Sequence, residues 1–126
     1  MNSLFYELIR DIPFSTSTSY SKTKDLVVEF DDKFEVSIEL PGVDKTDISV
    51  EVDKGCLVVK ANRKDPYKDT TATVLASTRV FGQFERSYKL SETIATESID
   101  ATYVDGILTV SLNKQESKKP SKITIK

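Results

Sequence analysis

The chain has 126 residues, 30% of them charged and 38% hydrophobic, which is the length and composition of one domain with a modest core. Its net charge of −2 argues against nucleic-acid binding, because contacts to phosphate require a concentrated basic face. The sequence has no histidine and one cysteine, Cys56, which excludes an intrachain disulfide, a thiolate metal cluster and any nucleophilic site built on histidine.

The first 24 residues form a segment of their own. Five apolar side chains recur at spacings of three and four, which predicts one apolar stripe along a short helix that Pro13 ends. The stripe consists of Leu4, Phe5, Leu8, Ile9 and Ile12. Residues 15–24 are nearly all serine, threonine, lysine and tyrosine, a composition that predicts a flexible tether. We therefore expect residues 1–24 to be an N-terminal arm, with a frayed terminus of no function as the alternative.

From Asp25 onward the apolar residues recur with a period of two, the pattern of half-buried antiparallel strands. In the first run Leu26, Val28 and Phe30 form the alternating apolar set. The runs in this half of the chain are residues 25–30, 34–40, 48–53 and 56–61. Turn residues such as Pro41-Gly42 separate them, because proline lacks a donor for the sheet and glycine tolerates the turn.

The second half begins with a polar connection, residues 62–73, that is long for a hairpin in a small sandwich. Residues 73–81 are predicted to form a further strand. The remaining runs are residues 84–90, 99–103 and 108–112, with the strong hairpin signal Asp105-Gly106 before the last. About eight strands without an interior helix predict an all-β, immunoglobulin-like antiparallel sandwich over residues 25–112. Residues 113–126, polar except for Ile123 and Ile125, are expected to form a flexible C-terminal extension.

The sequence offers little for catalysis. Asp31 and Asp32 are adjacent, and adjacent strand residues face opposite sides of a sheet, so they do not form a converging acid–base pair. A calcium loop would need a glycine and regularly spaced oxygens, which the segment around Asp65 and Asp69 lacks. With only four glycines and no phosphate-binding loop, we expect neither an enzyme nor a cofactor. The apolar segments at the two ends of the chain indicate interaction sites instead.

Three motifs, in order, carry a resemblance to a known family. Leu40-Pro41-Gly42-Val43 closes an alternating strand, and Ala101 to Val110 contains Asp105-Gly106 followed by an aliphatic residue and leucine. Ile123-Thr124-Ile125 then lies near the C-terminus. Together they resemble the small heat-shock proteins, the α-crystallin domain family, over residues 25–112 and the tail. The sequence departs from the family at Ser91, where proline is frequent, and in its short arm.

The resemblance implies an ATP-independent holdase that binds unfolding proteins and assembles from dimers into a larger homo-oligomer. In such an assembly Ile123 and Ile125 dock into a groove of a neighbouring subunit. The candidate groove residues are Ile48, Val50, Val52, Ile99, Ala101 and Tyr103. Some of these must belong to the core, and the sequence leaves open which. The N-terminal stripe and the side of the groove formed by Ile48 are the candidate client sites.

The dimer interface is implied in the same way. The long connection, residues 62–81, would carry a strand that pairs with the partner, with Thr73, Val74 and Leu75 as its candidate contacts; a mobile loop is the alternative. Arg86 matches an arginine of the family's interface strand, and a guanidinium among apolar neighbours requires a carboxylate partner unless it extends to solvent at the rim.

The expected location is cytoplasmic, with no membrane partner, because no apolar run approaches the ~20 residues of a membrane span. A monomeric co-chaperone or scaffold module with the same fold is the alternative function. Such a module would not need both the isoleucine tail and the long connection.

Overall fold

The computed structural model describes residues 24–116 and 123–126. Within them lie seven strands and one short 3-10 helix, η1. In chain order the elements are β1 (Lys24–Glu29), β2 (Lys33–Glu39), η1 (Lys45–Asp47), β3 (Ile48–Asp53), β4 (Cys56–Arg63), β5 (Gly82–Lys89), β6 (Ile94–Val104) and β7 (Ile107–Lys114). The predicted N-terminal helix lies outside the described residues.

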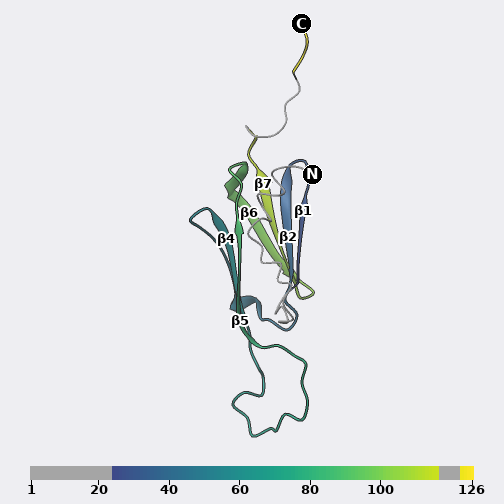
Figure 1. Cartoon of the computed structure of the whole chain (residues 1–126), viewed down its shortest axis with the longest axis vertical. Helices are drawn as coiled ribbons and strands as arrows, with labels where there is room; N and C mark the ends of the chain where they lie inside the picture. Colours follow the sequence, from purple (N-terminus) through teal and green to yellow (C-terminus); the bar gives the residue numbers. More distant parts are fainter. Residues whose placement is uncertain (1–23, 117–122) are drawn as a thin grey trace.

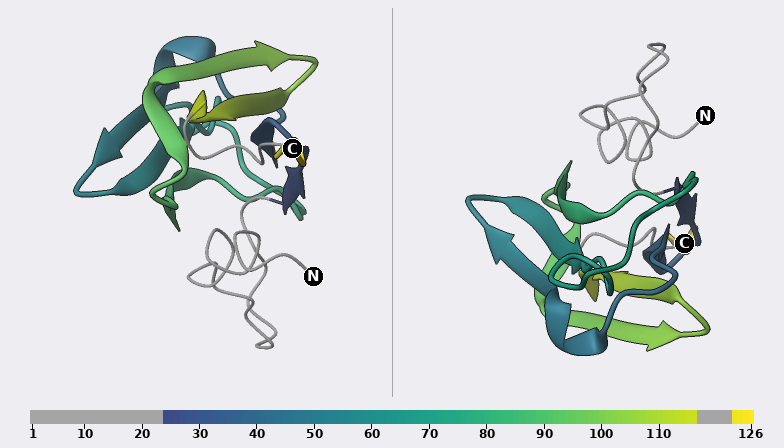
Figure 2. Two further views of the ribbon diagram at one scale, coloured as in Figure 1. Left: turned by 90° about the horizontal axis from the view of Figure 1, so that it is seen from above. Right: turned by 90° about the horizontal axis from the view of Figure 1, so that it is seen from below.

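The strands form two antiparallel sheets that pack face to face (Figures 1 and 2). One sheet has the strand order β1-β2-β7-β6 and the other the order β3-β4-β5. Contacts across the sandwich place β1 beside β5 at one open edge and β3 beside β6 at the other. The structure thus confirms the predicted all-β antiparallel sandwich, and its two edges differ in chemistry.

The core lies between the sheets and follows the period of two that the sequence shows. In β2 every second residue is buried, from Phe34 through Val36 to Ile38, and β7 repeats the pattern. The buried hydrophobic residues are Phe34, Val36, Ile38, Leu40, Val43, Leu57, Val59, Ala61, Tyr88, Ile94, Leu108, Val110 and Leu112. Fully burying one large apolar side chain stabilises the fold by roughly 1.5–3 kcal/mol. These buried side chains together are therefore the main source of the stability of the sandwich.

Strand β1 turns its apolar side chains away from the core, in contrast to β2 and β7. Leu26, Val28 and Phe30, the apolar set of the alternation, face outward and are 61%, 38% and 47% exposed. The opposite row, Asp25, Val27 and Glu29, faces inward and is half-buried. The carboxylates are accommodated there because each meets a cation from another strand. The period of two was correctly predicted, but it does not bury the apolar set.

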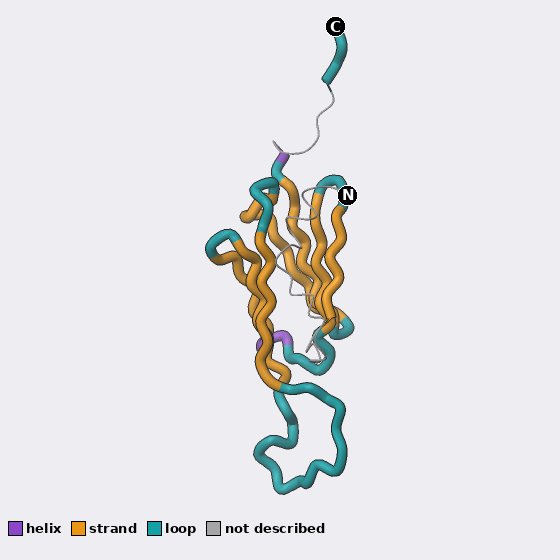
Figure 3. The backbone as a smooth tube through the Cα atoms, in the orientation of Figure 1, coloured by secondary structure: helices purple, strands orange, loops and turns teal. Residues whose placement is uncertain are grey.

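The strand predicted over residues 73–81 is wrong for the single chain. The connection between β4 and β5 runs as irregular backbone and projects from one end of the sandwich (Figures 1 and 3). A strand exists only where a neighbouring strand accepts its hydrogen bonds, and a segment projecting from the domain finds none in its own sheets. The root of this loop is fixed: Arg63 donates from Nε to the Pro41 carbonyl at 2.9 Å and from Nη1 to the Val80 carbonyl at 3.2 Å.

Candidate interaction sites

The open edge between β3 and β6 holds a small apolar groove. Its cavity volume is about 160 Å³, and its lining includes Ile48 and Val50 from β3 and Ala101 and Tyr103 from β6. Four of the six predicted groove residues therefore come together. The other two, Val52 and Ile99, lie outside the lining. Val52 is 42% exposed, whereas Ile99 packs against the core, as Ile48, Val50 and Tyr103 also do.

Tyr103 fixes one wall of the groove through its hydroxyl group. The oxygen lies 2.6 Å from the carbonyl oxygen of Leu40 and 2.8 Å from that of Val43, and its one proton serves both. The two sequence motifs meet at this point, because the Leu40 N–H donates to the Gly106 carbonyl at 2.6 Å. Gly106 has a φ of 75°, and a Cβ there would lie 3.2 Å from the Pro41 Cα, so a larger residue is strained and crowded.

The C-terminal motif does not occupy the groove of its own subunit. Ile123 and Ile125 are 86% and 94% exposed. Thr73, Val74 and Leu75 of the loop are exposed as well, Val74 by 64% and Leu75 by 94%. The predicted client-binding stripe at residues 4–12 lies outside the described residues. Among the described residues, the loop and the tail thus each present a short uncovered apolar segment, in addition to the outward row of β1.

At the opposite edge, between β1 and β5, a polar cluster joins the two sheets. Arg86 Nε lies 3.2 Å from Asp25 Oδ2, which supplies the carboxylate that the sequence required for this arginine. The partner comes from the same chain. Tyr88, fully buried on the same face of β5, donates its hydroxyl proton to the same oxygen at 2.6 Å. Sequence reasoning missed Asp25 and Tyr88, because hydrophobicity assigns Leu26, Val28 and Phe30, and not Asp25, to the core side of this strand.

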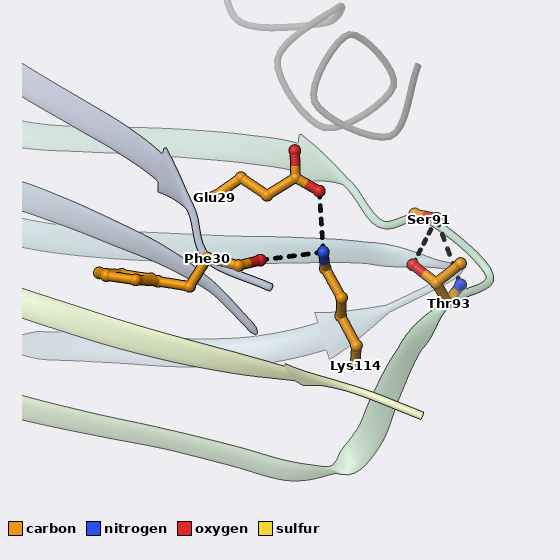
Figure 4. A network of polar contacts seen from close by, with 5 residues as sticks. All are labelled: Glu29, Phe30, Ser91, Thr93 and Lys114. Carbon is orange, nitrogen blue, oxygen red and sulfur yellow. Dashed lines mark hydrogen bonds and ion pairs between the residues drawn. The ribbon is translucent and has the colours of Figure 1, made fainter. Parts of the chain in front are cut away.

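A second cluster fixes the end of β1 to the end of β7 (Figure 4). Lys114 Nζ lies 2.9 Å from Glu29 Oε2 and donates to the Phe30 carbonyl at 3.0 Å, with the Phe34 ring 5.0 Å away. The backbone N–H groups of Lys114 and Gln115 donate to carbonyl groups of neighbouring segments. Strand β7 thus continues two residues past position 112, the expected end of the domain.

Ser91, the departure from the family pattern, lies beside this cluster (Figure 4). Its hydroxyl accepts a hydrogen bond from the Thr93 N–H at 3.2 Å and lies 2.9 Å from the Thr93 hydroxyl. These local bonds hold the turn before β6, the task for which a proline ring is suited by its fixed φ.

The environment of Tyr88 predicts a loss of stability at alkaline pH. Burial first, and then the hydrogen bond to Asp25, raise the pKa of Tyr88 well above its usual range. A tyrosine in the unfolded chain ionises at about pH 10, whereas Tyr88 in the folded protein keeps its proton to a higher pH. The stability that the protonated Tyr88 hydroxyl gives the fold is therefore complete below about pH 10 and is lost as the pH rises further. Alkaline unfolding followed by circular dichroism should therefore shift to higher pH in Tyr88→Phe. An unchanged alkaline transition would contradict this.

Among the residues described, no three cysteine, aspartate or glutamate side chains gather in a way that would hold a metal ion. None of the helices in the described part of the chain is long and apolar enough to span a membrane.

The seven antiparallel strands, their order in the sheets and the open β3/β6 edge define a sandwich of the α-crystallin type. The pattern of the Hsp20/alpha crystallin family matches residues 26–126. The chain therefore belongs to this family and is a small heat-shock protein.

Relatives agree with this assignment. Small heat shock protein C2 of Rickettsia felis is 28% identical over 123 residues, which cover 97% of this chain and 80% of the relative. The 18 kDa antigen 1 of Mycobacterium avium is 34% identical over 100 residues, 79% of this chain and 61% of the antigen. The chain thus matches less than two thirds of that antigen's length.

Solved structures show the same fold. A small heat-shock protein from Xylella fastidiosa superposes with a TM-score of 0.71 at 28% identity, covering 82% of this chain and 95% of that one. Heat shock protein 16.0 from Schizosaccharomyces pombe gives 0.70 at 32% identity, with coverage of 90% and 81%.

Proposed function

We propose that this protein is an ATP-independent holdase that binds unfolding proteins and prevents their aggregation. The observation that carries the proposal is the pairing of an uncovered Ile-x-Ile tail with an apolar groove that its own tail leaves unfilled. A chain with such a tail and such a groove can assemble reversibly. When subunits dissociate, the apolar surfaces of the tail and the groove become accessible to other proteins. The proposed function requires no catalytic site or cofactor and no nucleic-acid or membrane partner. The proposed location is cytoplasmic.

The tail and groove are complementary in spacing. Ile123 and Ile125 are two residues apart, so in an extended segment both side chains leave the same face about 6.6–6.8 Å apart. Ile48 and Val50 present the same spacing on β3. The tail of one subunit, residues 113–126 in the expected division of the chain, would lie along the β3/β6 edge of another. The small heat-shock protein from Xylella fastidiosa has a distinct high order structure, which is consistent with such links between subunits.

The building block in this proposal is a dimer formed by the β4–β5 loop. Thr73, Val74 and Leu75 would pair with the partner near the edge where Arg86 and Asp25 join the sheets. The ion pair already exists within one chain, so the role of Arg86 would be to hold β1 in place for the partner.

A heated client protein provides the test of the function. At equal subunit ratios, light scattering of the client should fall to a small fraction of the control in the absence of ATP, and ATP should not change it. The matched control is an inert protein of similar charge. A requirement for ATP, or no suppression at any ratio, would rule out the holdase.

We place the first client contacts in the N-terminal stripe of Leu4, Phe5, Leu8, Ile9 and Ile12 and at the Ile48 side of the groove. Replacement of Phe5, Leu8 and Ile9 by serine should then weaken suppression severalfold while the melting temperature stays unchanged. A large drop in melting temperature would instead show that these side chains belong to the domain core.

A further inference from the structure

The β4–β5 loop leaves the sandwich where the ladder between its two strands ends. Arg63 is the last residue of β4 and Gly82 the first of β5, and these two residues form the final pair of the ladder. Residues 64–81 form the loop between them. Strand pairing therefore does not direct the loop beyond this point, and its direction depends on side-chain contacts at its root.

Arg63 joins three segments of the chain through one guanidinium group. It belongs to the limb that leaves β4, and its Nη1 donates to the Val80 carbonyl, on the limb that returns to β5, at 3.2 Å. Its Nε donates at 2.9 Å to the carbonyl of Pro41, in the connection between β2 and β3. A guanidinium group holds its N–H donors in a rigid planar fork, so the two bonds orient both limbs relative to that connection.

Arg79 makes a second contact between the returning limb and the same connection. The centre of its guanidinium group lies 4.9 Å from the centre of the Phe81 ring, within the range of a cation–π contact. A Cβ placed on Gly42 would lie 3.8 Å from Arg79 Nη2, so the guanidinium group also lies against the backbone of the connection.

Lys64 is the third basic residue at the root. Its Nζ lies 3.2 Å from Oδ2 of Asp47, the last residue of η1. The Lys64 side chain is 65% exposed, so this ion pair adds little on its own. All three basic residues nevertheless contact the connection between β2 and β3. Its helix η1 lies at the end of the sandwich from which the loop projects (Figure 3).

The connection is itself fixed to the core, so it can serve as a base for the loop. Leu40 and Val43, on either side of Pro41-Gly42, are buried. Both of their carbonyl oxygens lie within hydrogen-bond distance of the Tyr103 hydroxyl group. A loop that is fastened to this base therefore keeps a set position relative to both sheets.

We propose that Arg63 is a positioning residue that sets the direction of the β4–β5 loop before a second copy binds, with Arg79 as its support. This inference rests on the dimer proposed above, in which the loop contacts the partner. Residues 72–77 are all exposed in the single chain, so they take their direction from the root. A segment already held in its bound direction loses less conformational freedom on association, so the dimer is strengthened without an added contact.

Arg63→Ala in the full-length chain tests the proposal, with Thr70→Ala as the matched control. Thr70 Oγ1 donates to the Tyr67 carbonyl at 2.8 Å, so the control also removes a side-chain bond to a carbonyl group of the loop, but away from the root. The dissociation constant of the dimer is measured by native mass spectrometry over a dilution series. Melting temperatures of both variants show whether the sandwich stays intact.

Spin labels report the direction of the loop independently of the dimer. In a Cys56→Ser background, nitroxide labels are attached at Lys68→Cys in the loop and Ser87→Cys in β5, two positions that are exposed. Their distance distribution is recorded at a dilution at which native mass spectrometry shows mainly monomer, so that no partner holds the loop. A side chain that only stabilised the sandwich would leave this distribution unchanged.

Arg63→Ala is expected to raise the dissociation constant at least ~10-fold, because association must then order the loop. The label distribution should lose its single narrow peak while the melting temperature stays that of the parent, and Thr70→Ala should change none of these. Arg79→Ala, which leaves both Arg63 bonds in place, should show the same two changes to a smaller extent.

An unchanged label distribution or an unchanged dissociation constant in Arg63→Ala would overturn the proposal. If Arg63→Ala lowers the melting temperature, Arg79→Ala decides in its place, and the absence of both changes in that variant would overturn the proposal equally. A parent chain that is monomeric at every concentration would contradict the dimer itself, and the label distribution would still show whether Arg63 directs the loop.

Discussion

Replacing Ile123 and Ile125 by alanine is expected to reduce the assembly to dimers while each subunit stays folded. Both side chains are almost fully exposed in their own subunit, so their loss removes no buried surface from the sandwich. Fully burying one isoleucine side chain in a neighbour's groove is worth roughly 1.5–3 kcal/mol. Ordering a flexible segment costs on the order of 1 kcal/mol or more per residue. One tail should therefore bind its groove weakly.

Many weak tails hold a closed assembly together because each acts at a high effective concentration. Loss of both isoleucines removes the link from every subunit at once, so the effect on subunit number should be large. Native mass spectrometry of the double variant measures it. Thr124→Ala is the matched control, since its side chain leaves the other face of an extended segment. A large oligomer that persists in the double variant would remove the tail from the mechanism.

The groove itself was largely predictable from the sequence. A period of two assigns Ile48 and Val50 to one face of β3, and the Asp105-Gly106 turn fixes the hairpin that holds Tyr103 opposite Leu108. The sequence did not separate Ile99 and Val52 from the other four, because burial depends on how far one sheet extends over the other. That overlap is a property of the packed sandwich and not of either strand.

Alternation alone could not predict which row of β1 side chains faces the core. Both of its rows alternate equally well, and hydrophobicity alone selects Leu26 and Val28 for the core. Two carboxylates face inward instead, because Arg86 and Lys114 meet them there from β5 and β7, which are distant in sequence. Pairing between positions 25 and 86 or 29 and 114 follows from the strand order, which a single sequence does not specify.

Deleting residues 66–77 is expected to convert the dimer into a folded monomer. The structure shows why the fold should survive. Loop contacts such as the Tyr67 N–H to Asp65 Oδ1 hydrogen bond stay within the loop, whereas the bonds from Arg63 to Pro41 and Val80 lie outside the deletion. Residues 64–65 and 78–81 remain to join β4 to β5, and a connection of this length is ordinary for neighbouring strands.

The dimer should be lost because the deletion removes the exposed segment that contains Val74 and Leu75, the only part of the loop proposed to enter the partner's sheet. A matched control replaces residues 66–71 with glycine and serine at constant length and keeps residues 72–77. The control should remain dimeric by native mass spectrometry, and both variants should retain the β-rich circular dichroism spectrum of the parent. If the deletion variant still runs as a dimer, the interface lies elsewhere, because a pairing strand that is absent cannot hold two sheets together.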